Sequence, residues 1–281
     1  MRIKVTADST CDLTPEIVSE LDITIIPLYI NIGDKTLKDT VEIHPADIFD
    51  YVDSGSGVCS TAACSIGDYV DLFKKFSPEY DAVIHIDISS DFSVCYQNAC
   101  IAAADFDNVY VVDSRNLSTG TGHLAMDAVY MAREGKSAEE IVGILKAKTA
   151  KLDVSFVIDS LKYLSKGGRC SSIAYLGANM LKLKPCIEVI DGKMEVGKKY
   201  RGAFTKCIRE YVTDRLKGRD DLDPCRIYCT YAERTPQEAI DAALEAINEY
   251  GNFEVVLQST AGCTISNHCG PVCLGVLFYR K

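Results

Sequence analysis

The segment from Asp81 to Ala104 is the feature that most constrains the fold of this chain. Residues 82–88 (Ala-Val-Ile-His-Ile-Asp-Ile) form an apolar run typical of a buried strand, and the polar turn Ser89-Ser90-Asp91-Phe92-Ser93 follows. Residues 94–104 then continue as a helical run. A strand whose carboxyl end leads into a helix is where open α/β sheets bind ligands. The unpaired N–H groups of the first helical turn attract anions. We therefore predict a cradle for a carboxylate or phosphate here, with Ser93 either binding the ligand or only capping the helix.

Two other predicted strands in the first half end in the same kind of turn. Residues 3–7 stop at Asp8-Ser9-Thr10-Cys11-Asp12, and residues 108–113 stop at Asp113-Ser114. Strands and helices alternate up to a helix at 137–150, whose start carries the capping-box pair of a serine and a glutamate three residues later. This alternation predicts a parallel sheet with helices on both faces.

The second half has a different pattern. Its predicted elements are strand 154–158, the hairpin 185–200 around Asp191-Gly192, helix 203–217, strand 225–231, helix 235–250, strand 253–258 and strand 274–279. Helices mixed with hairpins favour an α+β domain with a mixed or antiparallel sheet. We predict an α/β protein of two domains: 1–152, the N-terminal α/β domain that carries the cradle, and 153–281, the C-terminal α+β domain.

Charge and cysteine usage exclude several classes of protein. The net charge of −10 disfavours binding to nucleic acid. No apolar run reaches the ~20 residues of a membrane-spanning helix, and residues 1–5 do not resemble a signal peptide, so we expect a cytoplasmic protein. The 13 cysteines are scattered, and Cys263, Cys269, Cys273 and His268 lack the spacing of a zinc site. We predict no metal, and free thiols in a reducing compartment.

The absence of several motifs excludes further kinds of catalytic and cofactor-binding site. The chain has no P-loop, no complete G-x-G-x-x-G and no G-x-S-x-G elbow, so we predict no nucleotide cofactor and no α/β-hydrolase. Among the four histidines, His44, His85 and His123 fit structural roles. His268 is different, because it lies in the small-residue loop 266–271 before the last strand, where an imidazole could meet a ligand. Arg169, after two glycines, could bind an anion or a partner, or be a surface charge.

Several segments follow one another in the order of a known family. They are Asp8–Leu13, Thr61–Tyr69, Ser89–Ala99, Tyr163–Arg169 (Y-L-S-K-G-G-R), Lys184-Pro185, Lys199 with Arg201, and His268 with Gly270-Pro271-Val272. In this order they resemble the DegV family over essentially the whole chain. The resemblance implies a two-domain bacterial protein that binds one long-chain fatty acid, with the tail in an apolar tunnel and the carboxylate at the domain interface.

The family resemblance also implies a partner and a set of site residues. DegV proteins serve in phospholipid metabolism as the binding subunit of fatty acid kinase, and a separate ATP-binding subunit phosphorylates the bound acid to an acyl phosphate. By position, the hydroxyls of Thr61 and Ser93 would bind the carboxylate, with the N–H groups of Val94 and Cys95 behind Ser93 and His268 close by. Arg169 and Arg201 would face the kinase subunit and its phosphate.

The chain departs from the family pattern at two places beside this predicted site. Ser93-Val94-Cys95 stands where the family has S-G-T, and Ala62-Ala63-Cys64 replaces serine, glutamine and proline. A branched valine does not easily adopt the positive φ open to glycine, so a turn that needs one would have to be rearranged.

Three functions remain open at this point. The resemblance favours a protein that binds but does not catalyse, with a fatty acid as its only ligand and a transient contact with a membrane surface left open. A small hydrolase or transferase using Ser93 and His268 is the first alternative. A lipid-sensing protein that binds a partner other than a kinase is the second.

Overall fold

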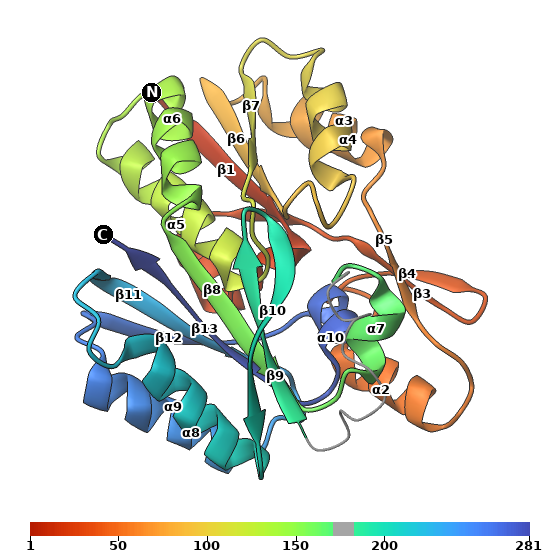
Figure 1. Cartoon of the computed structure of the whole chain (residues 1–281). Helices are drawn as coiled ribbons and strands as arrows, with labels where there is room; N and C mark the ends of the chain where they lie inside the picture. Colours follow the sequence, from red (N-terminus) through yellow and green to blue (C-terminus); the bar gives the residue numbers. More distant parts are fainter. Residues whose placement is uncertain (171–182) are drawn as a thin grey trace.

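The N-terminal half is built on a parallel sheet, as the alternating pattern predicts. The computed structural model describes residues 1–170 and 183–281. Its four-stranded sheet has the order β2 (Thr24–Ile26), β1 (Ile3–Asp8), β6 (Ala82–Asp87) and β7 (Val109–Asp113), with all neighbours parallel (Figure 1). The three strands β1, β6 and β7 each end at an aspartate. Their polar turns therefore lie together at the carboxyl edge of the sheet.

Helices cover both faces of this sheet. On one face, α3 (Ile66–Phe76) and α4 (Cys95–Ala103) share a hydrophobic core with Val83. On the other, α5 (Thr119–Arg133) and α6 (Ala138–Thr149) share a core with Ile84 and Ile86. The period-two alternation of a strand directs successive side chains of β6 to opposite faces, which is why one apolar run supplies both cores. The capping box predicted at the start of α6 is confirmed.

The C-terminal half is a mixed six-stranded sheet. Its order is β10 (Lys193–Arg201), β9 (Leu183–Ile190), β8 (Leu152–Ile158), β13 (Cys273–Arg280), β11 (Leu222–Tyr231) and β12 (Val255–Thr260). β11 and β12 are parallel, and the other pairs are antiparallel. The predicted turn is confirmed, because Asp191 and Gly192 have φ of 49° and 81°, as a type I′ hairpin requires.

The two faces of this second sheet pack against different partners. One face shares a core with α8 (Phe204–Leu216) and α9 (Gln237–Tyr250). The opposite face contributes Val154 and Leu277 to one core of the N-terminal half, and Phe156 and Ile158 to the other. The second sheet therefore lies against the N-terminal half, and apolar side chains from both halves meet there.

The remaining elements belong to neither of these two sheets. They are η1 (Ser9–Cys11), α1 (Pro15–Glu20), α2 (Pro45–Asp53), α7 (Lys162–Gly167), α10 (Cys263–Cys269) and a three-stranded sheet in the order β4 (Lys35–Lys38), β3 (Tyr29–Ile32) and β5 (Ser60–Ala62). Figure 1 shows α10 beside α7 and α2. Within the described ranges, none of the helices combines the length and apolar character needed to cross a bilayer.

The structure adds one element and corrects one expectation in this region. The segment around Thr61 forms strand β5, which pairs with β3. His268, expected in a loop, lies in helix α10. In both cases the partners come from distant parts of the chain. The first N–H groups of α10 donate to the carboxylate of Asp39, at 2.8 Å from Cys263 and 3.1 Å from Thr264.

Candidate functional site

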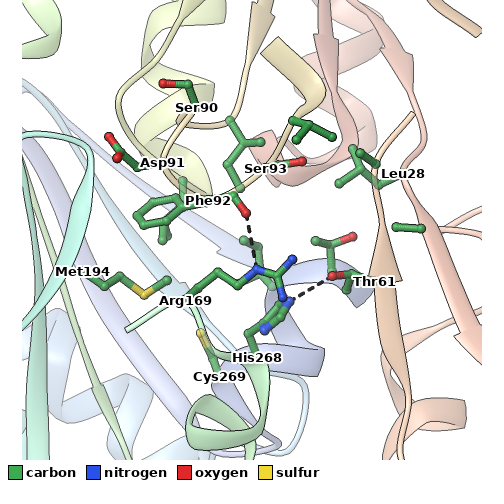
Figure 2. Close-up of a pocket in the computed structure, with 17 residues that line it drawn as sticks. Leu28, Thr61, Ser90, Asp91, Phe92, Ser93, Arg169, Met194, His268 and Cys269 are labelled. Atoms are coloured by element: carbon green, nitrogen blue, oxygen red, sulfur yellow. Dashed lines mark hydrogen bonds between the residues drawn. The ribbon is translucent and has the colours of Figure 1, made fainter. Parts of the chain in front are cut away.

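A cavity of about 310 Å³ opens between the carboxyl edge of the N-terminal sheet and helix α10 (Figure 2). Most of its wall is apolar, and its polar side chains come from four separate parts of the chain. The lining residues are Leu28, Thr61, Ala62, Ala63, Ile88, Ser90, Asp91, Phe92, Ser93, Val94, Leu117, Arg169, Met194, Thr264, Ile265, His268 and Cys269.

Thr61 and His268 meet across the cavity wall. Thr61 comes from β5 and His268 from α10, and the Thr61 Oγ1 lies 3.0 Å from the His268 Nε2. Burial and the nearby Arg169 guanidinium lower the pKa of His268 from 6.5 to about 4, so the imidazole is neutral at pH 7. A neutral ring that donates from Nε2 leaves the Thr61 hydroxyl hydrogen free to point into the cavity.

The backbone of Gly167 holds this imidazole from behind. A Cβ built on Gly167 would lie only 2.1 Å from the His268 Nδ1, so a larger residue at position 167 would displace the ring. Among the described residues, the Nδ1 has no hydrogen-bond partner. The first glycine of the Y-L-S-K-G-G-R segment, Gly167, is thus needed for close packing against His268, whereas the second, Gly168, has a positive φ of 67°.

Ser93 lies at the start of α4 and lines the cavity. Its Oγ accepts a hydrogen bond from the Cys95 N–H at 3.2 Å and lies 3.1 Å from the Cys95 Sγ. Ser93 thus bonds the first N–H group of α4, donates its hydroxyl hydrogen to the Cys95 Sγ and lines the cavity, and its binding of a ligand stays a prediction. Val94 also lines the cavity, with an ordinary φ of −80°, so this turn needs no glycine. Cys95 is buried behind Ser93 and is not part of the lining.

Arg169 extends across the cavity toward the other polar groups. Figure 2 shows its guanidinium between Phe92 and His268, where Nε donates to the Phe92 carbonyl at 3.4 Å and Nη1 donates to the Gly167 carbonyl at 2.8 Å. Arg201 is exposed at the end of β10 and lies outside the lining. The structure thus brings Thr61, Ser93, Val94, Arg169 and His268 around one cavity, and leaves Arg201 apart.

The one carboxylate in the lining is already neutralised. Asp91 forms an ion pair with Arg115 at 2.8 Å, and Lys193 lies 3.8 Å from its other oxygen. An anionic ligand at Ser93 and Thr61 would therefore be attracted by the Arg169 charge and would not be repelled by an unpaired carboxylate in the lining.

The apolar wall continues inward beyond this cavity. Leu117, Ile265 and Cys269 also line a narrow void between the two halves, together with Phe156, Ala232, Ala261 and Cys273. Sequence reasoning missed this part of the site, because its residues come from separate elements and carry no local signal beyond being apolar. The larger cavity has its polar groups at Thr61, Ser93 and His268, and the small apolar void of about 20 Å³ lies behind its apolar wall.

Comparisons with known proteins identify the family of this chain. Residues 2–281 match a family model described as "Uncharacterised protein, DegV family". A DegV domain-containing protein of Caldanaerobacter subterraneus is 32% identical over 284 residues, which cover 100% of this chain and 99% of the relative. Another from Clostridium acetobutylicum is also 32% identical, with the same coverage.

Solved structures share the whole fold. A fatty-acid-binding DegV family protein from Thermus thermophilus superposes with a TM-score of 0.91 at 28% identity, covering 100% of both chains. DegV from Bacillus subtilis, described as a fatty acid binding protein, gives 0.83 at 27% identity, also over 100% of both chains. A stearic acid-binding protein from Eubacterium ventriosum gives 0.82 at 26% identity, covering 99% of this chain and 98% of the other. A family match over nearly the full length, on a fold shared from end to end, shows that this chain belongs to the DegV family.

Proposed function

We propose that this chain binds one long-chain fatty acid without catalysing a reaction on it. The observation that carries the proposal is the largely apolar cavity whose polar side chains include Thr61, Ser93, His268 and Arg169. Such a cavity suits a molecule with an apolar tail and an anionic head, and the tail would continue into the apolar void behind it. The relatives described as binding fatty acids, which share the fold over their full length, support the same ligand.

The tail would supply most of the affinity. Burying about fifteen methylenes at ~0.8 kcal/mol each offers about 12 kcal/mol before the costs of ordering the chain. A buried carboxylate without hydrogen bonds would cost much of this gain. The hydroxyls of Thr61 and Ser93, with the charge of Arg169, provide the donors that the carboxylate needs. The head group therefore sets the orientation of the ligand in the cavity.

The proposal includes a separate ATP-binding kinase subunit as the partner. On that subunit, a carboxylate oxygen of the bound acid would attack the terminal phosphorus of ATP, forming an acyl phosphate and releasing ADP. The chain has no nucleotide-binding motif of its own, which fits a division of labour between two proteins. Arg169 and Arg201, both exposed, are the cations we assign to the side that meets this partner and its phosphate. The work would take place in the cytoplasm, in phospholipid metabolism.

The geometry gives less support to an enzyme that uses Ser93 and His268. A serine nucleophile needs a base within hydrogen-bond reach. Here the Ser93 hydroxyl interacts with Cys95, while the His268 Nε2 is bonded to Thr61.

We also propose the domain boundary at 152/153. Strand β8, the first strand of the C-terminal sheet along the chain, begins at Leu152, which supports this boundary.

Calorimetric titration with saturated fatty acids of 12 to 18 carbons tests the proposal. We expect one site per chain, with affinity rising with tail length until the cavity is full. The absence of binding at every length, in protein first stripped of lipid, would contradict it.

A further inference from the structure

The hairpin of β9 and β10 reaches from the C-terminal sheet to the N-terminal half, where its turn lies beside the end of β7 (Figure 1). The pairing of β9 with β8 runs over residues 186–189, so residues 190–193 extend beyond it as a two-stranded arm. Strand β10 also has a register shift between Val196 and Lys199. A two-stranded hairpin is marginally stable by itself, so the position of this arm depends on what its turn contacts.

Two side chains of the N-terminal half donate hydrogen bonds to the turn of the arm. The Arg115 Nη2 donates to the Asp191 carbonyl, and the Ser89 Oγ donates to the Gly192 carbonyl at 2.8 Å. The approach is close, because a Cβ built on Gly192 would lie 2.7 Å from the Arg115 Cζ and 2.8 Å from the Ser89 Oγ. Arg115 and Ser89 therefore hold the turn against the carboxyl edge of the N-terminal sheet.

The Arg115 guanidinium is itself fixed by the turns at this edge. Arg115 has a φ of 52°, in the left-handed region that is uncommon for residues other than glycine. The Asp113 carboxylate accepts the Arg115 N–H at 2.8 Å and the Ser90 N–H at 3.2 Å. The Arg115 Nη1 donates to Asp91 at 2.8 Å. Arg115 thus links the polar turn that lines the candidate site to the arm of the other half.

The arm borders a cavity on each of two sides. Met194, which follows the arm on β10, lines the cavity of the candidate site, on the same side as Asp91 and Phe92 (Figure 2). Asp191 and Gly192 line a separate, largely polar cavity of about 330 Å³. The turn can therefore shift toward this second space without displacing a close-packed core.

We propose that the arm is a movable wall of the candidate site and that Arg115 is a positioning residue, which sets how fast a ligand enters and leaves. Arg115 and Ser89 stand outside the described lining of the site cavity, so they act through the arm and Met194 rather than on the ligand. Their bonds to the arm are the same with and without ligand. They therefore slow entry and exit equally and change the affinity little. The identity of the ligand rests on the proposed fatty-acid function, whereas the arm and its contacts do not.

Stopped-flow fluorescence with cis-parinarate, a fatty acid that fluoresces when buried, tests the proposal. Mixing with the protein gives the association rate constant, and displacement by excess palmitate gives the dissociation rate constant. The variants are Ser89→Ala and Arg115→Gln. We expect each variant to raise both rate constants about threefold to tenfold, as the loss of one hydrogen bond implies, and to leave Kd within about threefold.

The matched controls are Ser77→Ala and Arg209→Gln. Ser77 is a half-buried serine that bonds Asn108, and Arg209 is an arginine on α8 whose acidic partners lie on α9. Both lie outside the described lining of the site cavity. We expect both rate constants of these controls to match those of the wild type.

Ser89→Ala separates movement of the arm from a change of charge. Arg115→Gln removes the positive charge beside Asp91, and the exposed carboxylate would repel a bound fatty acid and raise the dissociation rate constant alone. Ser89→Ala changes no charge. A rise of both rate constants in this variant therefore cannot come from repulsion of the ligand.

Nuclear magnetic resonance of methionine methyl groups follows the arm without any ligand. The chain has five methionines, and the Met194 signal is assigned by its absence from Met194→Leu. We expect the relaxation dispersion of this methyl group, which reports exchange in microseconds to milliseconds, to increase at least about threefold in Ser89→Ala and Arg115→Gln. Met126, buried on α5, is the internal control and should not change.

Each outcome decides the proposal. Faster entry and exit in both variants, with greater dispersion at Met194, supports it. A faster exit alone, confined to Arg115→Gln, would overturn it, as would rate constants that are unchanged in both variants. Failure of cis-parinarate and palmitate to bind the wild type would instead contradict the proposed function. The methyl measurement would then still decide whether Arg115 and Ser89 hold the arm.

Discussion

At the scale of single residues, the Thr61 and Ser93 hydroxyls decide how a carboxylate is held. We expect Thr61→Val and Ser93→Ala each to weaken palmitate binding about tenfold, because a hydrogen bond to a charged group contributes about 1.5–3 kcal/mol. Calorimetric titration measures the change. Thr213→Val is the matched control, since Thr213 is a half-buried threonine on α8 that bonds only the Arg209 carbonyl. Affinities unchanged in both site variants would show that the carboxylate lies elsewhere.

The pKa of His268 gives a second test at this scale. Because burial and Arg169 lower its pKa to about 4 in the folded protein, the unfolded chain takes up a proton near pH 6.5 and the folded chain does not. The free energy of unfolding should therefore fall as the pH decreases from 6.5 to 4, by at most about 3 kcal/mol from this residue. Urea unfolding of wild type and His268→Gln across this range measures the difference. Identical pH profiles would contradict the neutral, buried imidazole.

The residues of the site were predicted by resemblance rather than by local chemistry. Thr61 and His268 are 207 positions apart, and nothing in either segment alone shows that they form a hydrogen bond. Ser93 was the exception, because a serine between a buried strand and a helix predicts both a cap and an anion site. The lining contributed by Met194 and Ile265 had no sequence signal at all.

At the scale of elements, helix α10 depends on acidic residues from the N-terminal half. The Asp39 carboxylate accepts four hydrogen bonds: from Ser9 Oγ at 3.0 Å, from the N–H groups of Cys263 and Thr264, and from Thr264 Oγ1 at 2.6 Å. The Asp12 carboxylate accepts the Gly262 N–H at 2.8 Å. These contacts fix the helix that carries His268, so they position the polar wall from a distance.

We expect Asp39→Asn to lower the free energy of unfolding by about 2–3 kcal/mol, since the amide offers one acceptor oxygen where the carboxylate offers two. The same variant should also weaken palmitate binding by more than its loss of folding stability explains. Asp153→Asn is the control, because Asp153 is likewise buried and bound by Arg215 and Arg219 but does not contact α10. Binding titrations at a temperature where all variants are folded separate the two effects. Equal losses of affinity in both variants would rule out a positioning role for Asp39.

The elements that were predicted correctly carry their own start signals. Two such signals are the capping pair of Ser137 and Glu140 and the turn at Asp191-Gly192. Each acts within a few residues, so its effect can be predicted from the sequence. Strand β5 and helix α10 are short, and their partners lie far along the chain. Tertiary contacts, not local propensity, create them.

At the scale of the whole molecule, a narrow apolar void lies between the two halves, and Ala232 and Ala261 line it. We propose that the end of the fatty-acid tail enters this void. We expect Ala261→Leu, and separately Ala232→Leu, to lower the affinity for an 18-carbon fatty acid at least fivefold more than the affinity for a 12-carbon one. The added side-chain volume shortens the space for the tail. The ratio of the two affinities, measured by competition with a fluorescent fatty acid, is insensitive to a general loss of stability. An unchanged ratio in both variants would show that the tail takes another route.

The alternation of strand and helix predicted the parallel sheet, and the hairpin pattern predicted the mixed one, because both depend on local periodicity. How the halves meet could not be predicted this way. Phe156 and Ile158 look like ordinary core residues of one strand, yet they pack into the core of the other half.

The most direct measurement is mass spectrometry of an organic extract of the purified, denatured protein. We expect one equivalent of a long-chain fatty acid per chain, and its identity would define the preferred tail. An extract without fatty acid, repeated after incubation of the protein with a fatty-acid mixture, would contradict the binding function and direct attention to the Ser93-Val94-Cys95 turn as the reason.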